Sequence, residues 1–477
     1  MQFKLANLFL ILIFVSIVET SFADDVGTSL NTNQTLDVAE STNATEQAEV
    51  VVSEEFEGLH KEKLKDVKEA TVESTTDTAE SSDFFWDIHW DKGLRYQLSS
   101  ENPFWSVLFL GSKKTETKLD GKIGLRLDLD GMIYDESYDV PSADEGFYAR
   151  RLRLYTAGYF FFFFPAFYKV ETEVSDGNLY LRESFLWLDQ VPYLQTVKIG
   201  HFKAPSTFDN MISSRDRSFM ESASPVEAFA QGLKVGIQLS DSLAEENITW
   251  AAGWFVNGNE TDLSDASDSL SRLIWRVTHL LVDDRDTHSL IHLGYSGSLV
   301  YTGDKDVQYR SRPESYVAPR LVDTGKIKAK DANIHAAEFA MTEGPFSFQS
   351  EFVHSLVYAE KEHLEFYGAY GTFGWCITGE NRRYLRDRGV FGQILPRNDF
   401  SLESGGLGAW EFVMRYSYLD LRDKSVDGGR MSTGAVGLNW HLNRTVTMRM
   451  NAIYSDVEGG ENPGHVIIGQ SRLSIDF

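Results

Sequence analysis

The segment Trp410-Glu411-Phe412-Val413-Met414-Arg415-Tyr416-Ser417-Tyr418 decides the fold class of this chain. Large apolar side chains share every second position from Trp410 onward, and the other face carries Glu411, Arg415 and Ser417. A period of two residues places successive side chains on opposite faces of a β-strand, so the segment predicts a strand with one apolar and one polar face. The same alternation recurs at residues 122–130, 233–240, 436–442 and 446–454.

The composition agrees with a large β-structure. The chain has 477 residues, with 32 Phe, 20 Tyr, 10 Trp and 37 Gly but only 11 Pro. Aromatic residues favour strands and glycines favour turns. A formal net charge of -26 argues against a nucleic-acid partner, which would need a basic surface. The single cysteine, Cys376, excludes an intramolecular disulfide and any site with several Cys ligands.

The first 83 residues differ from the rest of the chain. Residues 1–23 resemble a secretory signal, with Lys4, an apolar run at 8–18 and small residues before position 24. Residues 24–83 contain sixteen acidic residues and four lysines, and Phe56 is their only aromatic residue. We expect this acidic low-complexity segment to be disordered or partly helical, since it cannot bury a core. A short periplasmic coiled coil and a charged linker both remain open.

Residues 84–477 can form either a soluble β-domain or a transmembrane β-barrel, because alternation alone does not say which face meets the core. The secretory signal, the frequent aromatic residues and the terminal strand Arg472-Leu473-Ser474-Ile475-Asp476-Phe477 favour an outer-membrane barrel. Sixteen strands would leave about 25 residues for each strand and connection, which suits spanning strands of about 10 residues. The prediction is an all-β, antiparallel transmembrane barrel of about 16 strands.

The sequence contains none of the common catalytic motifs. It lacks the P-loop, the dinucleotide fingerprint, the H-E-x-x-H pair and the G-x-S-x-G elbow. His288 and His292 are four residues apart, a ligand spacing on a helix, but they lie in a strand-like context. We therefore expect no enzyme activity, no catalytic residue, no metal ligand and no cofactor.

Several segments of the chain, from about residue 84 to 477, resemble the phosphate-selective porin O and P family. They include Phe147-Tyr148-Ala149-Arg150-Arg151-Leu152-Arg153-Leu154, Val197-Lys198-Ile199-Gly200-His201-Phe202-Lys203-Ala204-Pro205 and Ser213-Ser214-Arg215-Asp216-Arg217-Ser218-Phe219-Met220-Glu221. The resemblance implies a 16-stranded barrel, usually a trimer, that passes small anions. It also implies that residues 213–232 form a loop that folds into the lumen. The family commonly has Arg after Phe-Met-Glu, where this chain has Ser222.

Basic side chains are the candidates for contact with a permeant anion, because a wall that strips water from an anion must replace the lost hydration. Residues in the inward loop or just before it are the constriction candidates: Arg215, Arg217 and Lys203. Basic residues opposite the apolar set of their strands are the lumen-facing candidates: Arg126, Arg151, Arg153, Lys234, Arg415 and Arg449. Each of these can instead be one member of a structural ion pair.

The sequence therefore predicts a porin of the bacterial outer membrane, with its N-terminal segment in the periplasm and lipid and identical subunits as partners. Small hydrophilic solutes or ions, with phosphate or other anions among them, would cross by passive diffusion. Residues 84–477 carry 40 basic and 54 acidic residues, so long-range steering favours cations, but the local field at the constriction can oppose the net charge, and the selectivity stays open. Two alternatives remain: a secreted soluble β-protein that binds carbohydrate, and a plugged outer-membrane barrel with a structural role.

Overall fold

The computed structural model describes residues 84–90, 94–100, 117–137, 139–162, 164–175, 178–243, 247–256, 270–303 and 305–477. The predicted signal at residues 1–23 and the acidic segment at 24–83 lie outside the described residues. Those two predictions therefore stay predictions.

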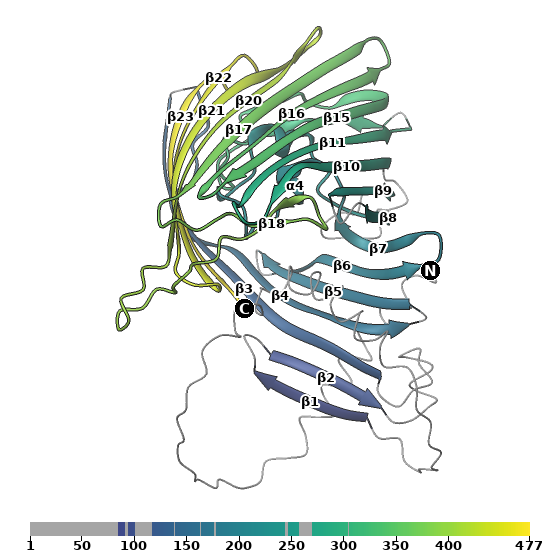
Figure 1. Ribbon diagram of the computed structural model, residues 1–477. Coiled ribbons are helices and arrows are strands. Elements are labelled where there is room, and N and C mark those ends of the chain that lie inside the picture. Colours follow the sequence, from purple (N-terminus) through teal and green to yellow (C-terminus); the bar gives the residue numbers. More distant parts are fainter. Residues whose placement is uncertain are drawn as a thin grey trace, which may run out of the picture. The chain divides into compact units, whose positions relative to one another are not determined.

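Sixteen antiparallel strands close into a barrel (Figure 1), which confirms the predicted fold class. The barrel closes because β23 pairs with β3 as well as with β22. In order around the barrel the strands are β3 (Thr117–Glu136), β4 (Gly146–Phe162), β5 (Phe164–Ser175), β6 (Asn178–Val191), β7 (Gln195–Lys203), β8 (Leu233–Leu243), β9 (Ile248–Val256), β10 (Ser271–Asp284), β11 (Ser289–Tyr301), β15 (Ile327–Glu343), β16 (Phe346–Ala359), β17 (His363–Cys376), β20 (Ala409–Asp423), β21 (Val426–His441), β22 (Val446–Glu458) and β23 (Gly464–Asp476).

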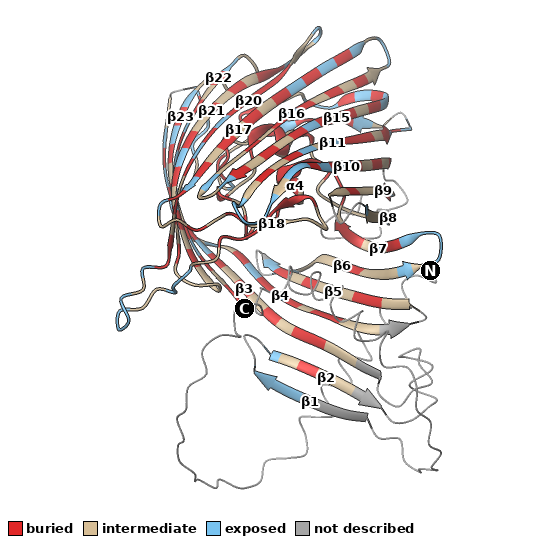
Figure 2. Cartoon of the chain, in the orientation of Figure 1, coloured by how far each residue is buried: buried red, intermediate tan, exposed pale blue. Residues whose placement is uncertain are grey.

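The apolar faces of the strands point outward and the polar faces point into the lumen. On β3, Leu129 and Ile133 are 42% and 67% exposed, whereas Asp128 and Asp130 between them are 0% and 2% exposed. Figure 2 shows the same alternation as bands of buried and exposed residues along the strands. An apolar exterior around a polar interior is the pattern of a membrane barrel and the reverse of a soluble sandwich. This arrangement favours the membrane barrel over the soluble carbohydrate-binding alternative.

The two ends of the barrel have different connections. At one end the described turns are short, as at 192–194, 285–288, 344–345 and 442–445, and in outer-membrane barrels short turns face the periplasm. Segment 377–408 is the exception at this end; it contains β18 (Tyr384–Leu385) and β19 (Val390–Phe391). The opposite end has the long segments 204–232, with α4 (Phe208–Met211) and α5 (Ser224–Phe229), and 302–326, with β12 (Asp306–Val307), β13 (Arg310–Ser311) and β14 (Val322–Asp323). None of the described helices is long and apolar enough to cross a membrane.

A hairpin of β1 (Phe84–Trp90) and β2 (Leu94–Ser100) extends the barrel wall beyond the C-terminal strand. β2 pairs with the first part of β3, along the same edge that β23 occupies further on. The Leu125 amide at this junction donates a hydrogen bond to the Phe477 carbonyl over 3.0 Å. The Trp90 ring lies 5.6 Å from the Phe477 ring, centroid to centroid. The hairpin thus continues the barrel wall along β3, beyond the point where β23 ends.

The three long segments fold inward and fill the lumen beside β15–β23. Phe229 of α5 packs with Tyr309 and Leu321 of segment 302–326 in one buried apolar cluster that includes Val413 and Ile453 of the wall. From the short-turn end, Phe391 packs edge-on against Phe208 of α4, with ring centroids 5.2 Å apart. A second cluster lies on the lumen face of β4–β10 and consists mainly of aromatic rings. The inward segments therefore pack mainly against the β15–β23 side of the lumen.

Candidate functional site

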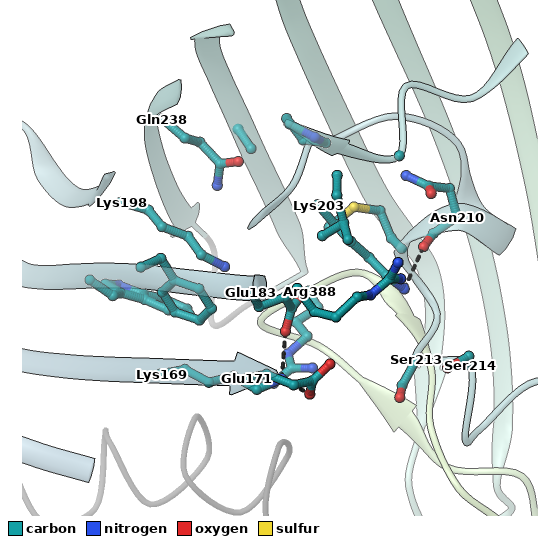
Figure 3. Close-up of a pocket in the computed structure, with 18 of the residues that line it drawn as sticks. Lys169, Glu171, Glu183, Lys198, Lys203, Asn210, Ser213, Ser214, Gln238 and Arg388 are labelled. Atoms are coloured by element: carbon teal, nitrogen blue, oxygen red, sulfur yellow. Dashed lines mark hydrogen bonds and ion pairs between the residues drawn. The ribbon is translucent and has the colours of Figure 1, made fainter. Parts of the chain in front are cut away.

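A cavity of about 470 Å³ lies between the inward segment 204–232 and the wall formed mainly by β3–β9 (Figure 3). Twelve basic and seven acidic residues line it, so its walls carry a formal excess of five positive charges in a chain whose net charge is -26. The basic residues are Arg126, Arg150, Arg151, Arg153, Lys169, Arg182, Lys198, Lys203, Arg215, Arg217, Arg276 and Arg388. The acidic residues are Glu171, Glu183, Asp189, Glu221, Asp241, Asp387 and Asp476.

The nine basic residues singled out from the sequence divide into two groups. Six of them come together at the cavity: Arg126, Arg151, Arg153, Lys203, Arg215 and Arg217. The other three, Lys234, Arg415 and Arg449, are not among the residues that line it. Lys234 lies on β8 on the same face as Gln238 and Ser240, which do line the cavity, and its Nζ donates to the Leu233 carbonyl over 3.1 Å.

Carboxylates orient the basic residues of β3 and β4. Asp128 accepts hydrogen bonds from Arg126 over 2.9 Å and from Arg151 over 2.8 Å. Arg153 donates to Glu173 over 2.9 Å and to Glu171 over 3.2 Å. A guanidinium can serve two carboxylates and still present a third N–H group, because it has five donors in a fixed plane. These ion pairs fix the geometry of the wall, and because Asp128 and Glu173 are not among the lining residues, they offset part of its excess of basic groups.

A β-bulge adds a basic residue that the alternation does not predict. The β3–β4 register shifts between Asp128 and Leu129, so that Arg151 pairs with Asp128 and Ala149 with Leu129, and Arg150 is left between them. Arg150 and Arg151 therefore both reach Glu221, at 3.2 and 3.6 Å, although neighbours in a regular strand point to opposite faces. No pattern in the sequence indicates this bulge, apart from the adjacent pair of arginines itself.

A second β-bulge, on β6, also adds a basic residue to the lumen face. The β5–β6 register shifts between Glu171 and Thr172, and Arg182 is the extra residue. Arg182 then contacts Glu173 over 3.1 Å, while its neighbour Glu183 accepts from Lys169 over 2.5 Å. The two bulges increase the density of charged groups at the cavity.

The constriction candidates bind the inward segment as well as facing the cavity. Lys203 donates to the carbonyl oxygens of Asn210 over 2.9 Å and Ile212 over 2.8 Å, at the end of α4 (Figure 3). Arg217 donates to the Asp209 carbonyl over 3.1 and 2.9 Å. Arg215 forms ion pairs of 3.2 Å with Asp216 and with Asp476 of the last strand.

Buried glutamates hold the inward segment in place, and the sequence reasoning did not identify them as anchors. Glu351 on β16 accepts the backbone N–H groups of Phe208 and Asp209, each over 2.8 Å. Glu411 on β20 accepts from the Ser218 hydroxyl over 3.1 Å. Glu314, within segment 302–326, accepts the Ser224 backbone N–H over 3.1 Å. Together these carboxylates fix both helices and the turn between them.

Arg415 and Arg449 support the packed side of the lumen. Arg415 donates to Glu314 over 3.2 Å and to the Glu221 carbonyl over 3.0 Å, and its guanidinium lies 4.4 Å from the centroid of the Phe219 ring. Arg449 donates to the Arg215 carbonyl. Both side chains point inward, as the alternation predicts, but the inward segments cover them.

Glu221 carries a negative charge among three arginines. Arg472 approaches it at 2.8 Å and Arg150 at 3.2 Å, with Arg151 slightly further away. Burial would raise the pKa of this carboxyl group, but the three guanidinium groups hold the pKa well below its usual range. Glu221 is therefore ionised and offsets part of the local positive charge.

Segment 377–408 is fixed by a cluster of polar groups on β10, β11 and β15. Arg276 donates to the carbonyl oxygens of Arg388 and Gly389, each over 2.8 Å, and to Glu338 over 2.8 Å. The Tyr384 hydroxyl lies 2.6 Å from Nδ1 of His292. The segment thus closes one side of the cavity from the short-turn end.

Comparison with known proteins defines the family. Residues 122–474 match the model of the family described as phosphate-selective porin O and P, and the chain belongs to this family. A Caulobacter vibrioides protein described only as uncharacterized is 26% identical over 328 residues, which are 65% of this chain and 64% of that protein. Porin O of Pseudomonas aeruginosa is 28% identical over 137 residues, which are 26% of this chain and 30% of that protein. The chain thus matches less than two thirds of the length of either relative.

The trimer form of OmpT, an outer-membrane protein of Vibrio cholerae, has a similar fold at 10% identity, with a TM-score of 0.49 over 75% of this chain and 99% of that one. Family membership and the closed barrel with its apolar exterior place the protein in the bacterial outer membrane. They indicate a channel rather than an enzyme.

Proposed function

We propose that the protein is an outer-membrane porin through which small hydrophilic solutes diffuse passively, with anions preferred over cations and phosphate among the permeant anions. One observation carries this proposal: twelve basic and seven acidic residues line the cavity of a strongly acidic chain. Membership of the phosphate-selective porin O and P family supports it.

An ion inside the cavity lies closer to the groups that line it than to most of the negative charge of the chain, and the lining has more basic than acidic residues. Exposed charges further away than about 8 Å are largely screened at physiological ionic strength, whereas charges that line the cavity are not. A basic wall also replaces the water that an anion loses in a narrow passage, and Arg can do so with two parallel N–H groups. The net charge of -26 therefore does not set the selectivity.

In this proposal Arg126, Arg151 and Arg153 on the wall and Arg215 and Arg217 on the inward segment face the permeant ion. Lys203 contributes its charge and also positions the segment through its two carbonyl contacts. Arg150 also faces the permeant ion from the wall, because the β-bulge turns its side chain inward.

We further propose that the protein is a homotrimer surrounded by outer-membrane lipid, as the family resemblance implies. Cross-linking of the detergent-extracted protein tests this point. A ladder that stops at three subunits would support it, and a single band at the monomer would contradict it.

The reversal potential of the refolded barrel under a KCl gradient in a planar bilayer tests the channel proposal, with phosphate then titrated in. We expect a potential of the sign that indicates chloride preference, and partial block of the chloride current by phosphate. Preference for potassium would overturn the anion proposal while leaving a porin. Correctly folded protein without conductance would favour the plugged barrel, for which the packed side of the lumen is the structural argument.

A further inference from the structure

The cavity has an aromatic wall that an inorganic anion does not need. On the lumen face, a row of rings crosses β4, β5, β6, β7 and β9: Tyr159, Phe167, Phe185, Phe202 and Phe255. The successive ring centroids are 5.0, 6.0, 6.1 and 5.6 Å apart. The interior of a wide barrel is ordinarily polar, so a continuous aromatic row there calls for an explanation.

Part of this row is open to the cavity. Phe167 and Phe185 line the cavity although they are only 3% and 7% exposed, whereas the neighbouring Trp187 is partly exposed. On β8, which contributes no ring, Gly236 leaves room for Phe255, because a Cβ atom there would lie 2.4 Å from that ring. The wall therefore offers a flat apolar surface beside charged groups.

A cation lies directly on this surface. The Lys198 ammonium is 3.9 Å from the centroid of the Phe185 ring and 5.4 Å from that of Trp187. Figure 3 shows Lys198, Gln238 and Lys203 around the same space, with Lys169 nearby. A cation over an aromatic face is held by the ring quadrupole, so its position is fixed relative to the rings.

We propose that Trp187, Phe185 and Lys198 form a subsite for organic anions that carry a flat apolar ring, of which an aromatic carboxylate is the simplest. The ring of the ligand packs against Trp187, and its carboxylate pairs with Lys198, which lies over the Phe185 ring. The volume of about 470 Å³ is within the range of small-molecule sites. This inference rests on the proposed anion channel and narrows its substrate class.

The test compares benzoate with acetate, two monocarboxylates that differ in the ring. Each is titrated as its sodium salt against the chloride current of the wild-type channel in a planar bilayer. We expect half-block by benzoate at a concentration roughly threefold to tenfold lower than by acetate, from the usual energy of an aromatic pair. Equal half-blocking concentrations in a chloride-selective channel would overturn the subsite and leave the porin function standing.

Variants identify the groups responsible. Trp187→Leu should abolish the advantage of benzoate and leave block by acetate unchanged, whereas Trp187→Phe should keep most of it. Lys198→Gln should weaken block by both anions. Trp254→Leu is the matched control, since Trp254 lies on the outer face of β9 and is 46% exposed; it should change neither value.

Failure of the inference can be told apart from failure of the proposed function. If Trp187→Leu keeps the wild-type preference for benzoate, or if Lys198→Gln leaves block by both anions unchanged, at normal chloride conductance, the subsite is wrong. If the wild-type channel prefers potassium and phosphate does not block it, the anion proposal falls and the subsite falls with it. Should Trp187→Leu not fold, Trp187→Phe and Lys198→Gln still carry the test.

Discussion

Replacing Glu351 with alanine should release the inward segment while leaving the barrel closed. The Glu351 carboxylate is 3% exposed and accepts the backbone N–H groups of Phe208 and Asp209 over 2.8 Å each, and the Tyr370 hydroxyl over 2.6 Å. A buried donor that loses its acceptor costs about 1–3 kcal/mol, and three buried donors would lose theirs. If water entering the space restores part of this, the net loss is about 3 kcal/mol, which is roughly a hundredfold change in the open population of the segment. The wall itself is held by strand pairing on both sides of β16, so it should persist.

Tryptic cleavage after Arg215 and Arg217 measures the opening. Arg215 is 6% exposed in the closed arrangement, so a protease reaches these sites only when the segment leaves its anchors. We expect Glu351→Ala to be cut roughly a hundredfold faster than wild type, with the heat-dependent shift in gel mobility of a folded barrel retained. Glu343→Ala, at an exposed position next to the turn after β15, is the control. A cleavage rate within threefold of wild type would refute the role of Glu351 as an anchor.

Three other changes separate wall charges from structural ones. Arg151→Gln removes one charge from the cavity and should lower the chloride-to-potassium permeability ratio, measured from reversal potentials, roughly twofold to threefold. This is the effect expected of a charge about 7 Å from the ion in water. An unchanged ratio would exclude Arg151 from the pathway. Arg415→Gln should leave that ratio unchanged but speed tryptic cleavage of the inward segment, because this side chain binds Glu314 and the Glu221 carbonyl; a changed ratio with normal cleavage would contradict this assignment. Because the pKa of Glu221 is lowered in the folded protein, its ion pairs stabilise the fold fully above the ordinary Glu pKa of about 4.3. This stabilisation is lost only as the pH falls through the lower pKa of the folded state. Single-channel noise should therefore be the same at pH 7 and pH 5, and a rise in noise between pH 7 and pH 5 that Glu221→Gln abolishes would contradict this prediction.

The strands, and which residues share a face of each strand, could be predicted from the sequence because apolar and polar side chains alternate with a period of two. Trp410 to Tyr418 lies within β20, and its apolar residues Met414 and Tyr416 are 42% and 58% exposed on the outer face. The polar residue between them, Arg415, is 4% exposed in the lumen. Alternation left open which face meets lipid, and the closed barrel answers that question.

The cavity could be predicted only in part, because two features interrupt the regular pattern. A bulge brings Arg150 inward beside Arg151, and alternation would place one of the two outside. Segment 377–408 folds inward from the end where short turns are the rule, and nothing in its composition distinguishes it from an exterior loop. Which lumen-facing residues stay open to the cavity depends on such long-range packing. Arg415 and Arg449 lie opposite the apolar residues of their strands, as Arg126 does, yet the inward segments cover them.

The distribution of partners explains how an acidic chain can enclose a basic cavity. Sixteen of the acidic residues lie in segment 24–83, outside the described residues. Others, such as Glu351, Glu411 and Glu314, accept hydrogen bonds from the inward segments, and none of the three lines the cavity. The cavity lies along the wall at β3–β7, and there the bulges add Arg150 and Arg182 to the regular lumen-facing set. In the proposed channel, ion selectivity depends on which face of the lumen the inward segments cover, so a variant that shifts a segment should change the selectivity more than a variant that changes the net charge of the exterior.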